Sequence, residues 1–375
     1  MPTALLVGAF GQRNPDDEAA LDAFLAALPD WRIVATSRHP ARTAATHGCA
    51  AVRDRDVRAL GRALLSTDAV VFGGGTVFAP PRPATRGSPD DALTWALRLT
   101  TGGQAIGKPV AMLGIGADPL LDARARRLAR ALVRRTDLLV LRDEESAHVL
   151  SAAGAPIPFR VGADPAWTLV DELPTAQERE SVIVALSHPA EGQHLGDLAD
   201  RVAAALAPLA TSGAKIELQP WHDSHAPAGG GGLESAIAAR LGGRVQVARP
   251  PADLADARIR VAGARLVVCM CAYAMMTAAA AGTPFVVLAH ERRQVSLARR
   301  LQQPAVLITA DPARIADELL RGVGGRAASP VAVRAEIARA AEGFRLLRLL
   351  LTGGAAAEMD TFDGLSLVPT PWTVN

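Results

Sequence analysis

Short apolar runs that alternate with helix-like segments constrain the fold of this chain more than any other feature. In the first half, the runs lie at residues 5–7, 33–35, 69–72, 110–113, 138–141 and 159–161. The second half repeats the scheme at residues 182–186, 216–218, 245–247, 266–269, 285–288 and 306–308. Continuous apolar runs flanked by glycine indicate strands buried on both faces of a parallel sheet with helical crossovers. The sequence therefore predicts an α/β protein with two Rossmann-like domains in series.

The length of 375 residues also favours two domains, because single cores stop growing at roughly 250–300 residues. We expect an N-terminal domain, a C-terminal domain, a C-terminal helix and a tail over residues 1–172, 180–325, 326–352 and 353–375, respectively. The polar segment 171–180 is typical of a linker, and the helical pattern of the third region is clearest at 331–351. The glycine-rich segment 226–232 is typical of a mobile loop that gates a cleft.

Composition excludes several classes of protein. The formal net charge is +2, and no dense basic run with interleaved aromatics is present, so we expect no nucleic-acid partner. The cysteines are sparse and odd in number, and no signal peptide precedes the first strand, which predicts a cytoplasmic protein. The longest apolar stretch, 267–288, contains Gly282 and Pro284, which predicts strand, helix and strand rather than an integral membrane segment.

The first strand leads into a glycine-rich turn and an acidic helix start. Asn14 is suited to cap this helix, Pro15 fits its first position, and Asp17 stands where a capping-box acid belongs. A dinucleotide-binding turn instead offers a third glycine and uncovered amides to a diphosphate. Here Asp16, Asp17 and Glu18 would repel a phosphate, so this is not a dinucleotide fingerprint.

Several motifs in order resemble the polysaccharide pyruvyl transferase family over roughly residues 4–325. The first comprises Gly8, Gly11, Asn14, Asp17, Glu18 and Ala19, with Asp16 where the family has a glycine. The others are Gly73-Gly74-Gly75, Gly114-Ile115-Gly116, Arg142-Asp143-Glu144-Glu145-Ser146 and Ala163-Asp164-Pro165-Ala166. The resemblance implies a GT-B-like fold with a cleft between the domains, in which phosphoenolpyruvate donates a pyruvyl group to a carbohydrate or polyol acceptor. It implies neither a cofactor nor a metal ion.

The resemblance also assigns substrate-binding residues. Gly11, Asn14, Asp17 and Glu18 match the family's first motif. The triple glycine can bring backbone N–H groups close to an anion or a sugar, although a tight turn explains it equally well. Arg142 matches the arginine that holds phosphoenolpyruvate, and a guanidinium suits two-point binding of a carboxylate or phosphate. An ion pair with Asp143 or Glu145 is the alternative interpretation of Arg142.

The second half departs from the family at its Arg-Leu-His triplet. A gapless alignment from Gly282-Thr283-Pro284 places Cys271-Ala272-Tyr273 on the triplet, whereas Arg265-Leu266-Val267 would need an insertion. Tyr273 would then replace the histidine that handles the acceptor proton, although its pKa of about 10 makes it a poor base and core packing is the alternative.

Nearby side chains are candidates to replace the lost groups. His290 follows the strand at 285–288 and is the best candidate for a relocated proton-transfer group, with a surface histidine as the alternative. Arg292 and Arg293 are candidate anion ligands in the same loop, and Arg293 matches a family lysine. His188, after the strand at 182–186, is a further candidate for substrate binding.

Other interpretations stay open at this point. A metal site is disfavoured, because His222 and His225 have one nearby acid and the pair Cys269 and Cys271 stands alone. A rival hypothesis keeps the scaffold but uses a nucleotide sugar or another donor in specialised metabolism. A third is a non-catalytic binding or scaffold relative. The oligomeric state, including a homo-oligomer, and the acceptor stay undecided.

Overall fold

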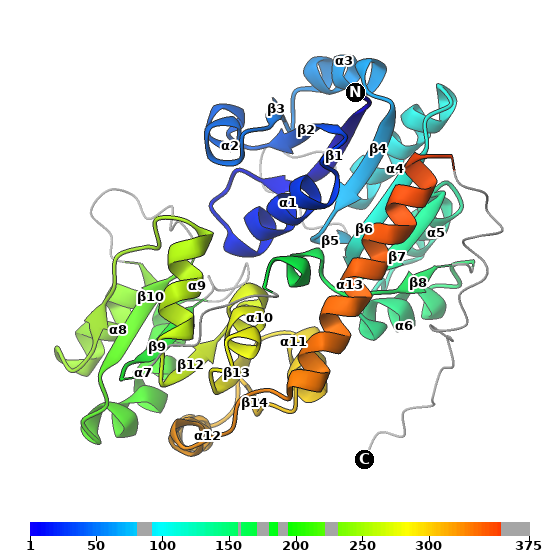
Figure 1. The fold of residues 1–375 in the computed structure, drawn as a ribbon. Helices are drawn as coiled ribbons and strands as arrows, with labels where there is room; N and C mark the ends of the chain where they lie inside the picture. Colours follow the sequence, from blue (N-terminus) through cyan, green and yellow to red (C-terminus); the bar gives the residue numbers. More distant parts are fainter. Residues whose placement is uncertain (81–91, 157–158, 171–179, 187–193, 222–231, 354–375) are drawn as a thin grey trace. The chain divides into compact units, whose positions relative to one another are not determined.

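The computed structural model describes residues 1–80, 92–156, 159–170, 180–186, 194–221 and 232–353, which form two compact units (Figure 1). The first unit comprises Met1–Gln12, Ala20–Thr168 and the chain from Glu336 onward. The second comprises Arg13–Ala19 and Leu169–Ala335. The expected linker, glycine-rich loop and tail lie outside the described residues, apart from Glu180, Gly232 and Gly353.

A parallel sheet in the order β3-β2-β1-β4-β6-β7-β8 forms the first unit, with β5 paired to β6. Its strands are β1 (Thr3–Phe10), β2 (Arg32–Ser37), β3 (Ala50–Arg53), β4 (Ala69–Gly73), β5 (Thr76–Phe78), β6 (Val110–Ala117), β7 (Leu138–Leu141) and β8 (Arg160–Val161). Its helices are α2 (Pro40–His47), α3 (Val57–Ser66), α4 (Ala92–Ala105), α5 (Ala123–Val133) and α6 (Glu144–Ala152). One boundary between the units lies in the turn before α1, after Gln12. The others fall within α1 (Pro15–Ala27), a short 3-10 helix (Pro165–Leu169) and α13 (Pro330–Leu351).

The second unit contains a parallel sheet in the order β11-β10-β9-β12-β13-β14. Its strands are β9 (Val182–Leu186), β10 (Ile216–Pro220), β11 (Gln246–Val247), β12 (Leu266–Cys269), β13 (Phe285–Ala289) and β14 (Ala305–Leu307). Its helices are α7 (Leu195–Thr211), α8 (Leu233–Leu241), α9 (Leu254–Ala262), α10 (Ala272–Ala280), α11 (Arg292–Arg300) and α12 (Pro312–Val323).

Strand order reverses once in each sheet, between β1 and β4 in the first and between β9 and β12 in the second. In doubly wound sheets a ligand normally binds beyond the carboxyl ends of the strands at such a reversal. The loops after these strands are therefore where a functional site is expected in each unit.

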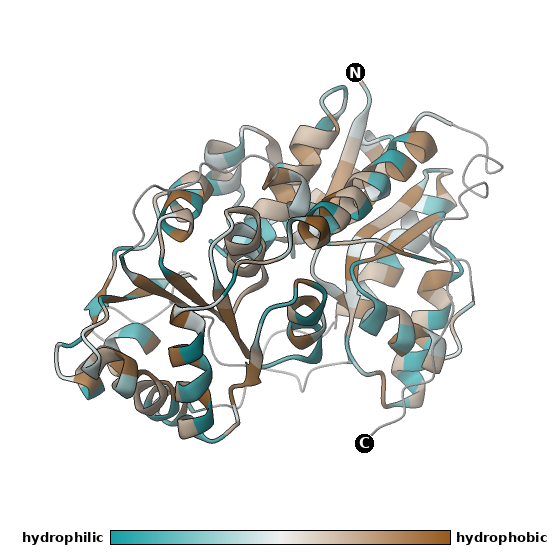
Figure 2. Cartoon of the chain, turned by 60° about the horizontal axis from the view of Figure 1, so that its bottom comes forward, coloured by the Kyte–Doolittle hydropathy of each residue, from teal (hydrophilic) through white to brown (hydrophobic). Residues whose placement is uncertain are grey.

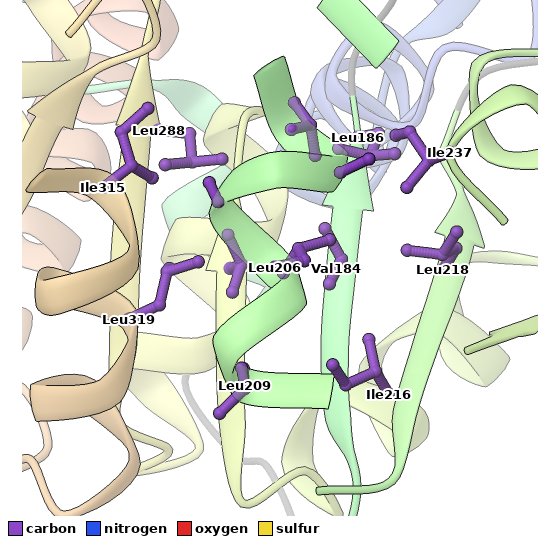
Figure 3. Packing of buried hydrophobic residues seen from close by; sticks show 14 of the residues in the cluster. Val184, Leu186, Leu206, Leu209, Ile216, Leu218, Ile237, Leu288, Ile315 and Leu319 are labelled. Atoms are coloured by element: carbon purple, nitrogen blue, oxygen red, sulfur yellow. The ribbon is translucent and has the colours of Figure 1, made fainter. Parts of the chain in front are cut away.

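Both faces of the second sheet are buried. Val184 and Leu186 of β9 pack on one face with Leu206 of α7 and Leu319 of α12 (Figure 3). Ile183, between them in β9, is 2% exposed although its side chain points to the opposite face. Figure 2 shows the strands as the hydrophobic layer of each unit. Burial on two faces explains why these strands are continuous apolar runs rather than alternating patterns.

All the runs expected to be strands overlap strands in the structure, which confirms the predicted α/β class. The helix expected at 331–351 is α13. Strands β3 and β5 were not predicted from the sequence. Strand β3 reads Ala-Ala-Val-Arg and is only partly buried at a sheet edge, and β5 is three residues long. Neither has the apolar run by which a buried strand is recognised.

Helix starts are mostly capped by local side chains. The predicted cap at Asn14 is confirmed, because its Oδ1 accepts a 3.1 Å hydrogen bond from the backbone N–H of Asp16. Aspartates at the N-cap positions of α3, α5, α6, α9 and α12 accept comparable bonds from the first turns of those helices. Among the helices that the structure describes, none is both long and apolar enough to cross a membrane.

Candidate functional site

Two glycine-containing motifs lie side by side in the first unit. The backbone N–H of Gly74 donates to the carbonyl of Leu113 over 3.1 Å, and that of Gly116 donates to the carbonyl of Gly75 over 2.8 Å. Gly74 and Gly75 have φ of 69° and 74°, in the left-handed region that favours glycine. The triple glycine therefore forms a turn directly beside the end of β6, which agrees with its alternative interpretation, and ligand binding by Gly73, Gly74 and Gly75 stays a prediction.

Arg142 lies in the same place. It follows β7, and its side chain is 15% exposed. A Cβ atom on Gly116 would stand 2.4 Å from Arg142 Nη2 and 3.1 Å from Thr76 Oγ1. The guanidinium therefore occupies the space that a side chain at position 116 would fill.

Two aspartates face this guanidinium. Arg142 Nε lies 3.4 Å from Asp143 Oδ2, and Nη1 lies 3.9 Å from Asp164 Oδ2. Asp143 also caps α6, since its Oδ1 accepts 2.7 Å bonds from both the N–H and the hydroxyl of Ser146. Asp143 is one of the two ion-pair partners considered for Arg142, and Asp164 was not among the predicted site residues.

The last motif of the first unit packs on the glycine turn after β6. Gly114 has a φ of 70°, and a Cβ atom there would lie 2.2 Å from Pro165 Cδ. Asp164 precedes that proline and reaches Arg142. Four motifs spread over about ninety residues of sequence thus meet at the carboxyl ends of β4, β6 and β7, where an α/β sheet normally binds its ligand.

The residues of the N-terminal motif hold local structure. Gly11 has a φ of 76°, and a Cβ atom there would lie 2.1 Å from Ser37 Oγ. Asn14 Nδ2 donates to Asp17 Oδ2 over 2.6 Å, and Glu18 Oε1 accepts from the backbone N–H of Arg13 over 3.2 Å. These contacts order the turn before α1. Substrate binding by Gly11, Asn14, Asp17 and Glu18 stays a prediction.

The start of α10 in the second unit is capped from a distant part of the sequence. Its N-cap residue, Cys271, makes no side-chain capping bond. Instead, Asp16 Oδ1 accepts a 2.8 Å bond from the Tyr273 N–H, and Oδ2 accepts a 3.2 Å bond from the Ala272 N–H. Asp16 belongs to the second unit together with α10. The signal for this role in the sequence was that Asp16 stands where the family has a glycine, and the sequence does not reveal its partner.

Tyr273 and Cys271 are enclosed by the protein. Tyr273 is 0% exposed, and its ring lies 6.5 Å from the ring of Trp221. Burial raises the pKa of the Cys271 thiol well above its ordinary value, and the nearby charge of Asp16 raises it further. The thiol is therefore protonated and unreactive at neutral pH. The burial of Tyr273 favours its alternative interpretation, core packing, and its catalytic role stays a prediction.

His290 follows β13 and faces charged neighbours. Its Nε2 lies 3.7 Å from Glu291 Oε1, and Glu291 forms an ion pair with Arg293. Burial lowers the pKa of His290, as does Arg293, whereas Glu291 and Asp16 oppose this effect. The imidazole is therefore neutral at pH 7 and able to accept a proton. His290 thus lies near Arg293, through Glu291, and near the start of α10, through Asp16. Arg292, in contrast, is exposed at the start of α11.

Gln294 fixes the loop that carries His290. Its Oε1 accepts 2.9 and 3.2 Å bonds from the backbone N–H groups of His290 and Glu291, and its Nε2 donates to the Met270 carbonyl over 2.7 Å. Gln294 and Glu291 were not among the predicted site residues. The Glu-x-x-Gln spacing, which is that of a capping box, was the signal that could have identified them.

His188, His222 and His225 lie outside the described residues. Within the part of the chain that the structure describes, no three histidine, cysteine, aspartate or glutamate side chains are placed to hold a metal ion.

Comparison with known proteins identifies relatives at two levels. Residues 18–292 match the family model described as polysaccharide pyruvyl transferase. No curated protein matches the sequence. Solved structures share the fold at low sequence identity.

A putative UDP-N-acetylglucosamine 2-epimerase from Listeria monocytogenes is 14% identical, with a TM-score of 0.59 over 98% of this chain and 99% of that one. UDP-GlcNAc 2-epimerase from Methanocaldococcus jannaschii is 11% identical, with a TM-score of 0.61 over 94% and 100% of the two chains. A glycosyltransferase from Rickettsia africae is 9% identical, with a TM-score of 0.54 over 94% and 96%. These similarities confirm the expected GT-B-like fold class.

Proposed function

The chain belongs to the polysaccharide pyruvyl transferase family, and we propose that it transfers a pyruvyl group from phosphoenolpyruvate to two hydroxyls of a carbohydrate or polyol, closing a ketal. The family match and the GT-B-like fold support a sugar-related transferase. The choice of donor and the roles of individual residues are part of the proposal.

The position of the His290 imidazole, in the loop after β13 and 3.7 Å from Glu291 Oε1, is the observation that carries the proposal. Attack by an acceptor hydroxyl requires a base, and a base is effective when it is unprotonated at the working pH. Burial keeps His290 in that form, and Glu291 at 3.7 Å from Nε2 is placed to stabilise the imidazolium that results. The relocated histidine thus supplies the proton-accepting group that Cys271-Ala272-Tyr273 lacks.

The reaction balances without a cofactor. The methylene carbon of phosphoenolpyruvate gains a proton from solvent and becomes a methyl group, which leaves a cationic centre at C2. An acceptor hydroxyl adds there and loses its proton to His290. Cleavage of the bond between C2 and the phosphate oxygen then releases phosphate, and a second hydroxyl closes the ketal as it passes its proton to the departing phosphate. Catalysis consists of positioning and charge stabilisation rather than a covalent enzyme intermediate.

Arginine side chains provide the proposed anion contacts. Arg142 is held over Gly116 at the carboxyl end of β7, with Asp143 and Asp164 fixing its direction. In the second unit, Arg293 is oriented by its ion pair with Glu291. A guanidinium fixed in this way suits a carboxylate or phosphate, which it can bind at two points.

Ligand-dependent thermal unfolding tests the donor. A ligand at a hundred times its dissociation constant stabilises the folded state by about 2.7 kcal/mol, which a thermal scan detects. We expect stabilisation by phosphoenolpyruvate and none by nucleotide sugars. A shift with nucleotide sugars alone would support the repurposed scaffold and contradict the proposal.

Phosphate release with a panel of carbohydrate and polyol acceptors tests the chemistry. His290→Gln and Arg142→Ala should each abolish release while the protein remains folded. His148→Gln is the matched control, because His148 is exposed on α6 and contacts the Glu144 carbonyl. Full turnover in His290→Gln would refute the assigned role, and a protein without turnover that copurifies with a pathway partner would favour the scaffold hypothesis.

A further inference from the structure

Helix α10 begins without a capping group of its own. No acidic residue lies in its first turn, and the thiol of its N-cap residue, Cys271, makes no capping bond. The first backbone N–H groups of a helix have no partner within the helix and carry partial positive charge. In this chain, α3, α5, α6, α9 and α12 satisfy such groups with an aspartate at the N-cap.

Asp16 satisfies the start of α10 as a bound oxyanion would. Its two carboxylate oxygens accept from different backbone N–H groups, those of Tyr273 at 2.8 Å and Ala272 at 3.2 Å. The two partners lie 257 and 256 positions away in the sequence. Paired N–H groups at a helix start are a common binding site for phosphate and carboxylate groups.

The surroundings of this contact are closed. Tyr273, Met270 and Trp221 are at most 2% exposed, and within the described chain the indole Nε1 of Trp221 has no hydrogen-bond partner. The charge of Asp16 raises the pKa of both Cys271 and His290, although burial dominates each shift. The Asp16 carboxylate is thus an anion that both side chains experience, together with Glu291 in the case of His290.

The position of α10 gives this contact a functional meaning. The helix follows β12, at the reversal of strand order in the second sheet. This is where doubly wound sheets normally place the charged part of a ligand.

We propose that Asp16 is a specificity-determining residue, whose carboxylate occupies the paired N–H groups at the start of α10 and excludes the phosphate of a ligand from them. Neither phosphoenolpyruvate nor a nucleotide sugar then places its phosphate on this helix. The proposal concerns the helix start alone and holds whichever reaction the protein catalyses.

Binding of inorganic phosphate to the full-length protein tests the proposal. Affinity is measured by isothermal titration calorimetry in the wild type, Asp16→Gly, Asp16→Asn and the control Asp197→Asn, at constant ionic strength set with chloride. The control removes the same charge from an exposed position on α7 of the same unit. It therefore separates the opening of the helix start from a change in overall charge.

We expect Asp16→Gly to bind phosphate about ten-fold more tightly than the wild type and Asp197→Asn, since a charge at a helix start contributes on this scale. Asp16→Asn should show a smaller gain, because its amide is neutral but still fills the site. Cooperative thermal unfolding establishes that each variant is folded. If Asp16→Gly does not fold, the phosphate affinity of Asp16→Asn still tests the proposal. Equal phosphate affinity in all folded variants would overturn the proposal. Because no turnover is measured, this result is independent of the donor and the reaction.

Discussion

Asp16 and Tyr273 lie 257 positions apart in the sequence, yet the Asp16 carboxylate accepts a 2.8 Å hydrogen bond from the backbone N–H of Tyr273. A long-range contact thus performs the task that a neighbouring side chain performs at most other helix starts of this chain. The stability of α10 therefore depends on a segment that precedes it by most of the sequence.

Replacing Asp16 with alanine should cost about 1 kcal/mol of unfolding free energy, the usual effect of removing a helix cap. Asp253→Ala is the comparison, because Asp253 caps α9 through a 2.8 Å bond from the Asp256 N–H. Urea unfolding should give similar losses for both variants. An unchanged midpoint for Asp16→Ala, with a loss for Asp253→Ala, would show that α10 does not need the long-range cap.

Gly116→Ala should remove donor binding with little loss of stability. The new Cβ would stand 2.4 Å from Arg142 Nη2, and the guanidinium, as the far end of a flexible side chain, is the group that yields. Gly61→Ala in α3 is the control, because nothing lies within 4 Å of its new Cβ and alanine favours a helix by up to about 1 kcal/mol.

The increase in unfolding temperature caused by phosphoenolpyruvate is measured in both glycine variants. We expect this increase to be lost in Gly116→Ala and kept in Gly61→Ala. An undiminished increase in Gly116→Ala would separate Arg142 from the donor site.

The activity should persist below the pH at which an ordinary histidine loses its function. Burial lowers the pKa of His290 from its usual 6.5, so the acid limb of kcat/KM should lie below that pH. Arg293 also lowers this pKa, whereas Glu291 and Asp16 raise it. Arg293→Gln should therefore move the acid limb to higher pH, and Glu291→Gln should move it to lower pH. If the acid limbs of the two variants move in the same direction, or do not move, the ionisation belongs to another group.

The same shift has a consequence for stability. Because the folded state disfavours the protonated imidazole of His290, the unfolded chain binds this proton more readily. The contribution of His290 to the unfolding free energy should therefore fall as the pH drops below about 6.5. Urea unfolding of the wild type and His290→Gln across this range measures how much of the pH dependence of the unfolding free energy comes from His290. This pH-dependent contribution should be absent above pH 7.

Two neighbouring leucines of α12 should differ widely in their effect on stability. Leu319 packs in the core of the second unit (Figure 3). It is 0% exposed, whereas Leu320 is 42% exposed. Leu319→Ala should cost roughly 2–5 kcal/mol because it removes packed atoms and leaves a cavity. Leu320→Ala should stay within about 0.5 kcal/mol of the wild type. Equal losses in denaturant unfolding would contradict the assigned orientation of α12.

The fold was predictable because its strands are buried on both faces. Val182–Leu186 and Phe285–Ala289 are apolar throughout, so they can be identified without knowledge of their neighbours. Strand β3 could not be found in this way, because an edge strand is partly exposed and its residues are fixed by pairing with β2. Pairing partners are a property of the fold and are not encoded in a local pattern.

The candidate site was predictable only in part, for a related reason. Arg142 and His290 follow apolar strands, so the chain itself marks them as loop residues at a sheet edge. Asp164 and Gln294 act through partners in other segments, Arg142 in one case and the Met270 carbonyl in the other. Such pairs arise from tertiary packing, which a single sequence does not display.

The packing of α13 against the first unit determines when that unit can be completed. Phe344 of α13 meets Phe24 of α1 edge to face, with ring centroids 5.0 Å apart, and both side chains are buried. During translation, the strands of the first unit leave the ribosome long before Phe344 is synthesised, while residues 169–335 of the second unit emerge in between. Domains generally fold as their residues emerge. The first unit is therefore the earliest to begin and the last to finish, and Phe24 lacks its Phe344 neighbour on the nascent chain until α13 has been synthesised.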